Sequence, residues 1–145
     1  MDLIILDCGA EIKGDSQRIG YQGKIECLSF NHGVHRSQQE FTVTKYIDGT
    51  TSSFIDYCNS ARVIPTAKVK IISLDGGAVD EFLVYTLTNV VVTSISIGGG
   101  AGDMPTETVT LNYTKIQWDY KLQAANASKP IVKSKSWNLE TGQAE

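Results

Sequence analysis

The chain has 145 residues and a formal net charge of −3, with 13 basic and 16 acidic side chains. This length suits one domain with a sizeable core, and the scattered basic residues argue against the dense positive surface that nucleic-acid binding requires. The first apolar run, residues 3–6, is too short for a signal peptide or a membrane span. We therefore expect one domain over residues 1–145, folded in the cytoplasm, with no nucleic-acid partner and no membrane insertion.

Strands dominate the predicted secondary structure, because apolar and polar residues alternate and β-branched residues are frequent. The Asp-Gly-Gly run at residues 75–77 is a strong hairpin turn signal, and Pro65 is expected to interrupt the chain before the strand that leads to this turn. The predicted strands cover residues 3–7, 23–31, 41–47, 68–74, 81–89, 90–97, 106–122 and 133–137.

One short helix is predicted between the third and fourth of these strands. Apolar residues recur at positions 54, 57, 58 and 61, which is the spacing of one helical face. Thr50 or Thr51 precedes this face and can accept a backbone hydrogen bond as the N-cap.

Two long stretches are expected to bend between sheets. Residues 81–89 run into residues 90–97 with no turn residue other than Asn89, which predicts a corner or bulge. In residues 106–122 the apolar positions change parity between Tyr113 and Ile116, and a shift of one residue exchanges the two faces of a strand. The predicted fold is therefore mainly β: a two-sheet antiparallel β-barrel with one short α-helix on its side.

Metal and nucleophile sites have little support. His32 and His35 are the only histidines, and no further ligand is evident near them in the sequence. Cys27 and His32 could form a nucleophile pair, but no residue that would orient the histidine is identifiable. Cys8, Cys27 and Cys58 include no CxxC pair and are expected to be buried free thiols. We therefore expect no enzyme activity, no metal and no cofactor.

The glycine-rich run at residues 98–103 invites comparison with a phosphate-binding loop. Such loops pass from a strand into a helix and carry a following Lys-Ser or Lys-Thr. Here the run leads through Met104 and Pro105 into another predicted strand. We expect a flexible connector.

Several segments in order resemble one known family. They are IECLSFNHG (residues 25–33), FTVTKYID (41–48), VVVTSIS (90–96) and ETVTLNYTKI (107–116), with the predicted helix between the second and the third. The combination resembles the haemolysin-coregulated protein (Hcp) family of bacterial type VI secretion, and the likeness spreads over nearly the whole chain.

The resemblance implies a structural, secreted tube subunit. Family members form hexameric rings that stack into the inner tube of a contractile injection machine and leave the cell without a signal peptide. The implied partners are further copies of the chain, the sheath and spike proteins, and small effector cargo in the lumen. Two alternatives stay open: a phage-type contractile tail-tube protein, and a monomeric β-barrel carrier of a small ligand.

Residues 27–31 suit a wall with a lumen side and a packed side. Cys27, Ser29 and Asn31 are small or polar and share one parity, whereas Leu28 and Phe30 share the other. Alignment to the family implies that Asn31 faces the lumen, with Ser29 beside it on the same parity; the alternative is that Asn31 merely ends a strand at the surface.

The connection at residues 35–40 is much shorter than the extended loop that the resemblance implies between the second and third strands. We expect rings to form through the barrel walls and their stacking into long tubes to be weakened.

Overall fold

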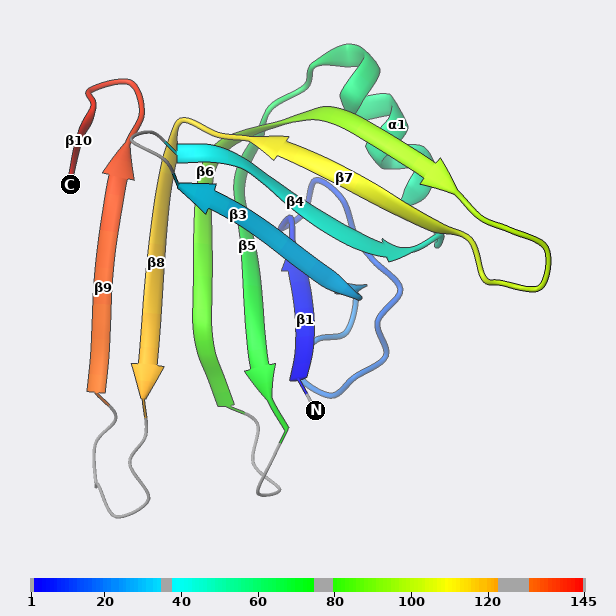
Figure 1. Cartoon of the computed structure of the whole chain (residues 1–145), viewed down its shortest axis with the longest axis horizontal. Helices are drawn as coiled ribbons and strands as arrows, with labels where there is room; N and C mark the ends of the chain where they lie inside the picture. The colour runs from blue at the N-terminus through cyan, green and yellow to red at the C-terminus, as the bar shows by residue number, and fades with distance from the viewer. Residues whose placement is uncertain (1, 35–37, 75–79, 123–130, 145) are drawn as a thin grey trace.

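The computed structural model of the chain describes residues 2–34, 38–74, 80–122 and 131–144. Within these residues the chain forms one α-helix and a set of antiparallel strands (Figure 1). In chain order they are β1 (Asp2–Asp7), β2 (Ile25–Cys27), β3 (Ser29–Val34), β4 (Gln38–Tyr46), α1 (Thr51–Ser60), β5 (Ile64–Ser73), β6 (Asp80–Gly98), β7 (Thr106–Asn112), β8 (Lys115–Leu122), β9 (Ile131–Asn138) and β10 (Gln143–Ala144).

The strands pair in two groups that share β6. The first group has the order β10-β9-β8-β6-β5-β1-β2, and the second has the order β3-β4-β7-β6. We call them sheet A and sheet B. In Figure 1, the strands of sheet B cross in front of those of sheet A. The mainly β, antiparallel fold with one short helix is confirmed, but the described pairings do not establish a closed barrel.

The predicted corner in β6 is confirmed. The strand is continuous from Asp80 to Gly98, and its first half pairs with β5 and β8 whereas its second half pairs with β7. Asn89 lies between the two halves with φ of 53°, a left-handed conformation that asparagine tolerates better than most residues. A register shift between Val92 and Ser94 adds to the bend.

The parity change in residues 106–122 also marks a change of sheet. β7 pairs within sheet B and β8 pairs within sheet A, and the chain breaks its ladder at Tyr113 and Thr114. The segment is therefore two strands, each in one sheet, where one long shared strand was predicted.

A third change of sheet was missed. Residues 23–31 were predicted to be one strand, but β2 pairs with β1 and β3 pairs with β4, with Leu28 between them. Leu28 was expected on the packed side, and this was wrong, because its side chain is 45% exposed. Its N–H still donates to the Thr44 carbonyl of β4 at 2.7 Å, so the chain stays hydrogen-bonded to sheet B where it passes from one sheet to the other.

The helix begins and ends close to the predicted positions. Phe54 and Tyr57 are buried on its inner face, and Ala61 ends it with φ of 52°. Thr50 is the N-cap residue, but its side chain accepts no capping hydrogen bond. Its hydroxyl and N–H donate instead to the Asp48 carboxylate, while Thr51 Oγ1 accepts the N–H of Asp48.

The core lies between the two sheets and under α1. Its largest fully buried apolar side chains include Phe41, Phe54 and Leu111, and Trp118 and Trp137 pack against it as predicted anchors. Pro65 does not interrupt the chain, since it is the second residue of β5. The predicted turn at residues 75–77 lies outside the described residues. Among those described, no helix is both long and apolar enough to cross a membrane.

Candidate functional site

β3 presents two different faces, as its alternation predicts. Ser29 and Asn31 are exposed, whereas Phe30 and His32 are half-buried and point to the opposite face, which packs on the core. Phe30 and Phe41 stack with ring centroids 6.0 Å apart. At Ser29 and Asn31, the exposed face of β3 therefore carries small polar side chains and no large apolar ones.

The same exposed face continues across the middle of sheet B as a regular array of small polar side chains, and on β4 this array is flanked by the exposed Glu40 and Tyr46. Strand register places one residue from each of β3, β4, β7 and β6 side by side in each row, because directly opposed residues share a face. We call this array the hydroxyl face. Its two rows are Ser29, Thr44, Thr108 and Ser96, and Asn31, Thr42, Thr110 and Ser94.

Neighbouring members of the hydroxyl face are linked in places. Thr44 Oγ1 and Thr108 Oγ1 lie 3.2 Å apart within hydrogen-bond reach, and Thr42 Oγ1 donates to the Asn31 carbonyl at 3.4 Å. No member of either row carries a charge or a large apolar group, so these two rows offer neither an anchor for a partner nor a strong electrostatic field. Such a surface is suited to lining a passage.

Both borders of sheet B are edge strands in the described pairings. β3 pairs only with β4, and the second half of β6, residues 91–98, pairs only with β7. Each border therefore presents a row of backbone N–H and C=O groups without a ladder partner, which is a template for pairing with another chain.

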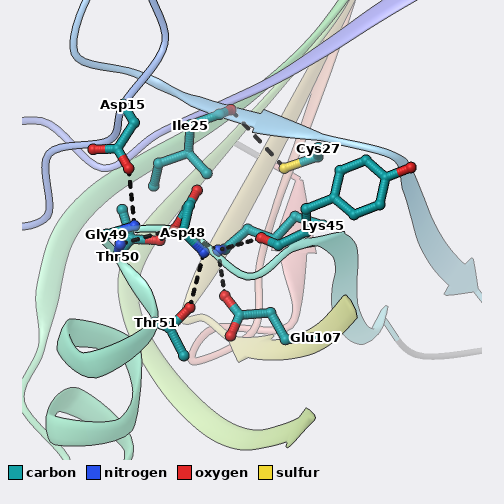
Figure 2. A network of polar contacts seen from close by, with 10 residues as sticks. Asp15, Ile25, Cys27, Lys45, Asp48, Gly49, Thr50, Thr51 and Glu107 are labelled. Atoms are coloured by element: carbon teal, nitrogen blue, oxygen red, sulfur yellow. Dashed lines mark hydrogen bonds and ion pairs between the residues drawn. The ribbon is translucent and has the colours of Figure 1, made fainter. Parts of the chain in front are cut away.

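A buried charge network lies behind the end of sheet B, next to the start of α1 (Figure 2). Lys45 and Glu107 are opposed residues of β4 and β7, and both side chains are fully buried in an ion pair. Lys45 Nζ also donates to Asp48 Oδ1 at 2.8 Å. Among the described residues, no hydrogen-bond donor other than this ammonium reaches the Glu107 carboxylate.

Asp48 connects this network to the helix. Its Oδ1 accepts hydrogen bonds from the Thr50 N–H, at 2.8 Å, and from the Thr50 hydroxyl. The N–H of the intervening Gly49 donates to Asp15 Oδ2 at 2.9 Å. Burial by itself raises the pKa of Asp48, but the hydrogen bonds from Lys45 and Thr50 outweigh burial and leave the pKa below its usual value. The network therefore positions α1 on sheet B.

The sequence carries a signal for this ion pair that was missed above. Lys45 continues the inward parity of Phe41 and Val43, and Glu107 continues that of Val109 and Leu111. A charged residue at an inward position of each of two strands suggests a buried pair. Only the register of β4 against β7 reveals that the two residues are opposed.

His32 and Cys27 do not form a nucleophile pair in the described contacts. His32 Nε2 lies 3.0 Å from the Tyr113 hydroxyl and its ring stacks on Phe41, whereas Cys27 Sγ lies 4.0 Å from the Ile25 carbonyl. Burial raises the pKa of the Cys27 thiol to about 12, so the thiolate is scarce at neutral pH.

The remaining candidates give no reactive site either. Burial raises the pKa of Cys8 to about 12. All three cysteines are free thiols, but only Cys8 is buried as predicted, whereas Cys27 and Cys58 are half-buried. The part of the chain that the structure describes contains no cluster of potential metal ligands, and His35 lies outside it. The glycine run joins β6 to β7 rather than a strand to a helix, with a turn in which the Asp103 N–H donates to the Gly100 carbonyl.

A hollow of about 330 Å³ opens beside β3 and is lined by His32, Val34, Tyr85 and Trp118. This volume is at the small end of the range of about 300–1,000 Å³ that is usual for ligand sites. Val34 on its rim is 62% exposed. The hollow is the feature that a small-ligand carrier would use.

Comparison with known proteins identifies relatives over most of the chain. The model of the family described as "Type VI secretion system effector, Hcp" matches residues 5–120. Protein hcp1 of Pseudomonas aeruginosa is 40% identical over 103 residues, which cover 70% of this chain but only 64% of that protein. Hcp1 from Salmonella typhimurium has a similar structure, with a TM-score of 0.89, 24% identity and 99% coverage of both chains. A type VI secretion system effector from Yersinia pestis has a TM-score of 0.79 and 22% identity, covering 93% of this chain and 98% of its own.

Proposed function

The chain belongs to the Hcp family of type VI secretion system effectors, and on this basis we propose that it is a subunit of the inner tube of that machine. It assembles into homohexameric rings, and the rings stack. The hydroxyl face of sheet B is the main support for this proposal. A passage for folded cargo needs a lining that is hydrated and uncharged and has no exposed apolar patches that would bind the cargo.

In this proposal, Ser29 and Asn31 face the lumen together with the rest of the hydroxyl face. Both are exposed on the side of β3 that lies away from the core. Small polar side chains hold hydration water without a specific pocket, so small effectors of different sequence can be carried past them.

The two borders of sheet B supply the contacts around the ring. β3 is one border and residues 91–98 of β6 are the other, so each copy offers two different edges to its neighbours. Pairing of one edge with the other is a heterologous contact, which generates a ring when the rotation closes. It would also join the hydroxyl faces of neighbouring copies into one continuous inner surface.

Each protomer acts as a single unit over residues 1–145, and its two sheets act as one barrel wall. Two features support closure of the wall: β6 belongs to both sheets, and the chain runs from β2 into β3 through Leu28, whose N–H bonds to β4. The barrel, the helix and the ring are structural parts, and we propose no enzymatic activity for them.

The wider partners follow from membership in the family: the sheath and spike proteins of the machine and small effector cargo. The subunit is made in the cytoplasm and reaches the outside, or a target cell, through the machine itself. β3 ends at Val34 and β4 begins at Gln38, so the connection between them is short and we expect stacking to be weak. Spontaneous long tubes at modest protein concentration in electron micrographs would contradict this expectation.

The first test is the mass of the purified chain by light scattering on a sizing column, with negative-stain images of the main peak. A hexamer mass with ring-shaped particles is expected. A clean monomer would contradict the ring and would favour a carrier that uses the hollow at His32 and Trp118.

The lumen assignment has its own test. Asn31→Cys in a Cys58→Ser background is labelled with a small gold cluster, and Asp56→Cys on the exposed side of α1 is the matched control. Gold is expected at the centre of the ring for Asn31→Cys and at the rim for Asp56→Cys. Gold at the rim for both variants would refute the assignment.

A further inference from the structure

An apolar hollow lies on the outer face of sheet A, away from the hydroxyl face. It has a volume of about 370 Å³ and is lined by Leu3, Gln17, Arg18, Ile19, Tyr21 and Leu74. We call it the Ile19 hollow. Its floor belongs to a second, small core cluster of Leu3, Ile5, Tyr21 and Ile72, against which Leu74 packs.

The walls of the Ile19 hollow are tied in place. The Tyr21 hydroxyl donates to Glu81 at 2.6 Å, and the Tyr21 N–H donates to the Arg18 carbonyl at 2.9 Å. Two backbone bonds between Ser16 and the stretch at Gly23 and Lys24 close the base of the same loop. This loop nevertheless holds the Ile19 side chain 90% exposed on the rim, beside an apolar floor. A preformed apolar hollow with an exposed apolar rim is a docking feature.

A complementary projection lies elsewhere on the chain, in the connection between β6 and β7. Figure 1 shows this connection projecting beyond both sheets, well away from the start of β1 where the hollow lies. Met104 on it is 67% exposed, and Asp103 beside it is exposed too. We call these two residues the Met104 knob. The base of the connection is held by the pairing of Gly98 with Thr106.

The chemistry of the knob matches that of the hollow. Methionine is flexible and polarizable, so it fills irregular apolar gaps well. Asp103 directly precedes Met104, and Arg18 directly precedes Ile19, so each apolar residue has a charged neighbour and the two charges are opposite. Arg18 Nε pairs with Glu26 at 3.0 Å, and the guanidinium carries further donors for a second carboxylate.

We propose that the Met104 knob of one copy docks into the Ile19 hollow of a second copy. The knob and the hollow lie at separate places on a fixed fold, so a copy cannot fill its own hollow. The contact is heterologous and repeats from copy to copy. This inference rests on the proposed function in one respect, namely that the partner is another copy of this chain.

The contact is small, so it is weak for a single pair of chains. A stable interface buries about 1,200–2,000 Å² in total, and one loop entering one hollow falls short of this area. When subunits are already joined in a ring, however, the same contact is made many times at once and the affinities reinforce one another. The knob and the hollow therefore act in assembly and not in the pairing of isolated monomers.

The test compares Met104→Asp and Ile19→Asp with Val63→Asp, a matched control at an apolar residue that is 48% exposed after α1. Sedimentation velocity over a range of concentrations measures the monomer, ring and stacked-ring populations, and circular dichroism checks that each variant is folded. Each of the first two variants is expected to need an at least about tenfold higher protein concentration than the unaltered protein before its rings stack. Val63→Asp should assemble like the unaltered protein.

Two further arms separate a specific contact from a general loss of apolar surface. When preformed Met104→Asp rings are mixed with preformed Ile19→Asp rings, one ring keeps its hollows and the other keeps its knobs, so two rings should stack once and then stop growing. Asp103→Arg and Arg18→Glu should each weaken assembly, and the double variant should restore it. The inference is overturned if the Met104 and Ile19 variants assemble like the unaltered protein, or if the double variant does not restore assembly. If the chain still forms rings in that case, the proposed function is unaffected. A wild-type chain that stays monomeric overturns both.

Discussion

Replacing Lys45 by methionine should destabilise this fold far more than a typical single substitution does. Methionine keeps the length of the side chain but removes the ammonium that is paired with Glu107, so a carboxylate in a fully buried position loses its charge partner. Breaking one side of a buried ion pair costs about 3–5 kcal/mol. The ammonium nitrogen of Lys45 also lies 5.6 Å from the centroid of the Phe54 ring, and the substitution removes this cation–π contact as well.

The expected cost translates into a clear thermal shift. A domain of this size loses about 2–4 °C in Tm for each kcal/mol, so Lys45→Met should lower Tm by about 6–20 °C. The measurement is thermal unfolding followed by circular dichroism, at one fixed protein concentration, because assembly would otherwise contribute to the apparent stability.

The double variant Lys45→Met/Glu107→Leu decides whether the unpaired charge is the cause. Replacing a buried pair by apolar residues of similar volume is often neutral or stabilising, so the double variant should recover most of the lost Tm. A loss below about 3 °C for Lys45→Met, or a double variant no more stable than the single one, would refute the reasoning.

Three other outcomes follow from single features of the structure. Because hydrogen bonds outweigh burial and lower the pKa of Asp48, its carboxylate contributes stability that is present above the unfolded pKa of about 3.9 and is lost as the pH falls through the folded value. Urea unfolding between about pH 7 and about pH 3 should therefore show a smaller acid loss for Asp48→Asn than for the unaltered protein, and equal losses would contradict this cause. Asn89 has φ of 53°, so Asn89→Val should cost about 1–2 kcal/mol in urea unfolding whereas Asn89→Gly should be tolerated, and the reverse order would show that the corner does not require a left-handed residue. Cys8 and Cys27, with pKa values raised by burial to about 12, hold only about one thiolate in 10⁴ at pH 8, so iodoacetamide should label them slowly until urea unfolds the chain; rapid labelling of either in the native state would disprove their burial.

Much of the fold is a local property and was readable from the chain. A strand exposes alternate residues to opposite faces, so a parity change between Tyr113 and Ile116 indicates a bulge or a change of sheet, and the structure has a change of sheet there. The change at Leu28 escaped the same reasoning because β2 has only three residues, too few to define a parity before the chain bends. Leu28 was consequently assigned to the packed side and Cys27 to the lumen side, and both assignments were wrong, because Leu28 is exposed and Cys27 packs against the core. Ser29 and Asn31 were correctly grouped on one face.

Local sequence patterns were enough to predict most strand positions, the helix, the corner at Asn89 and the small polar character of single strand positions. All of these depend on neighbours a few residues apart. The three-dimensional fold was needed to show that the polar positions of β3, β4, β7 and β6 align into the hydroxyl face and that Lys45 opposes Glu107. It was also needed to show that the connection carrying the Met104 knob lies away from the start of β1, which lines the Ile19 hollow. The physical reason is that register and relative position between distant segments are set by how the whole core packs, and no local pattern contains that information.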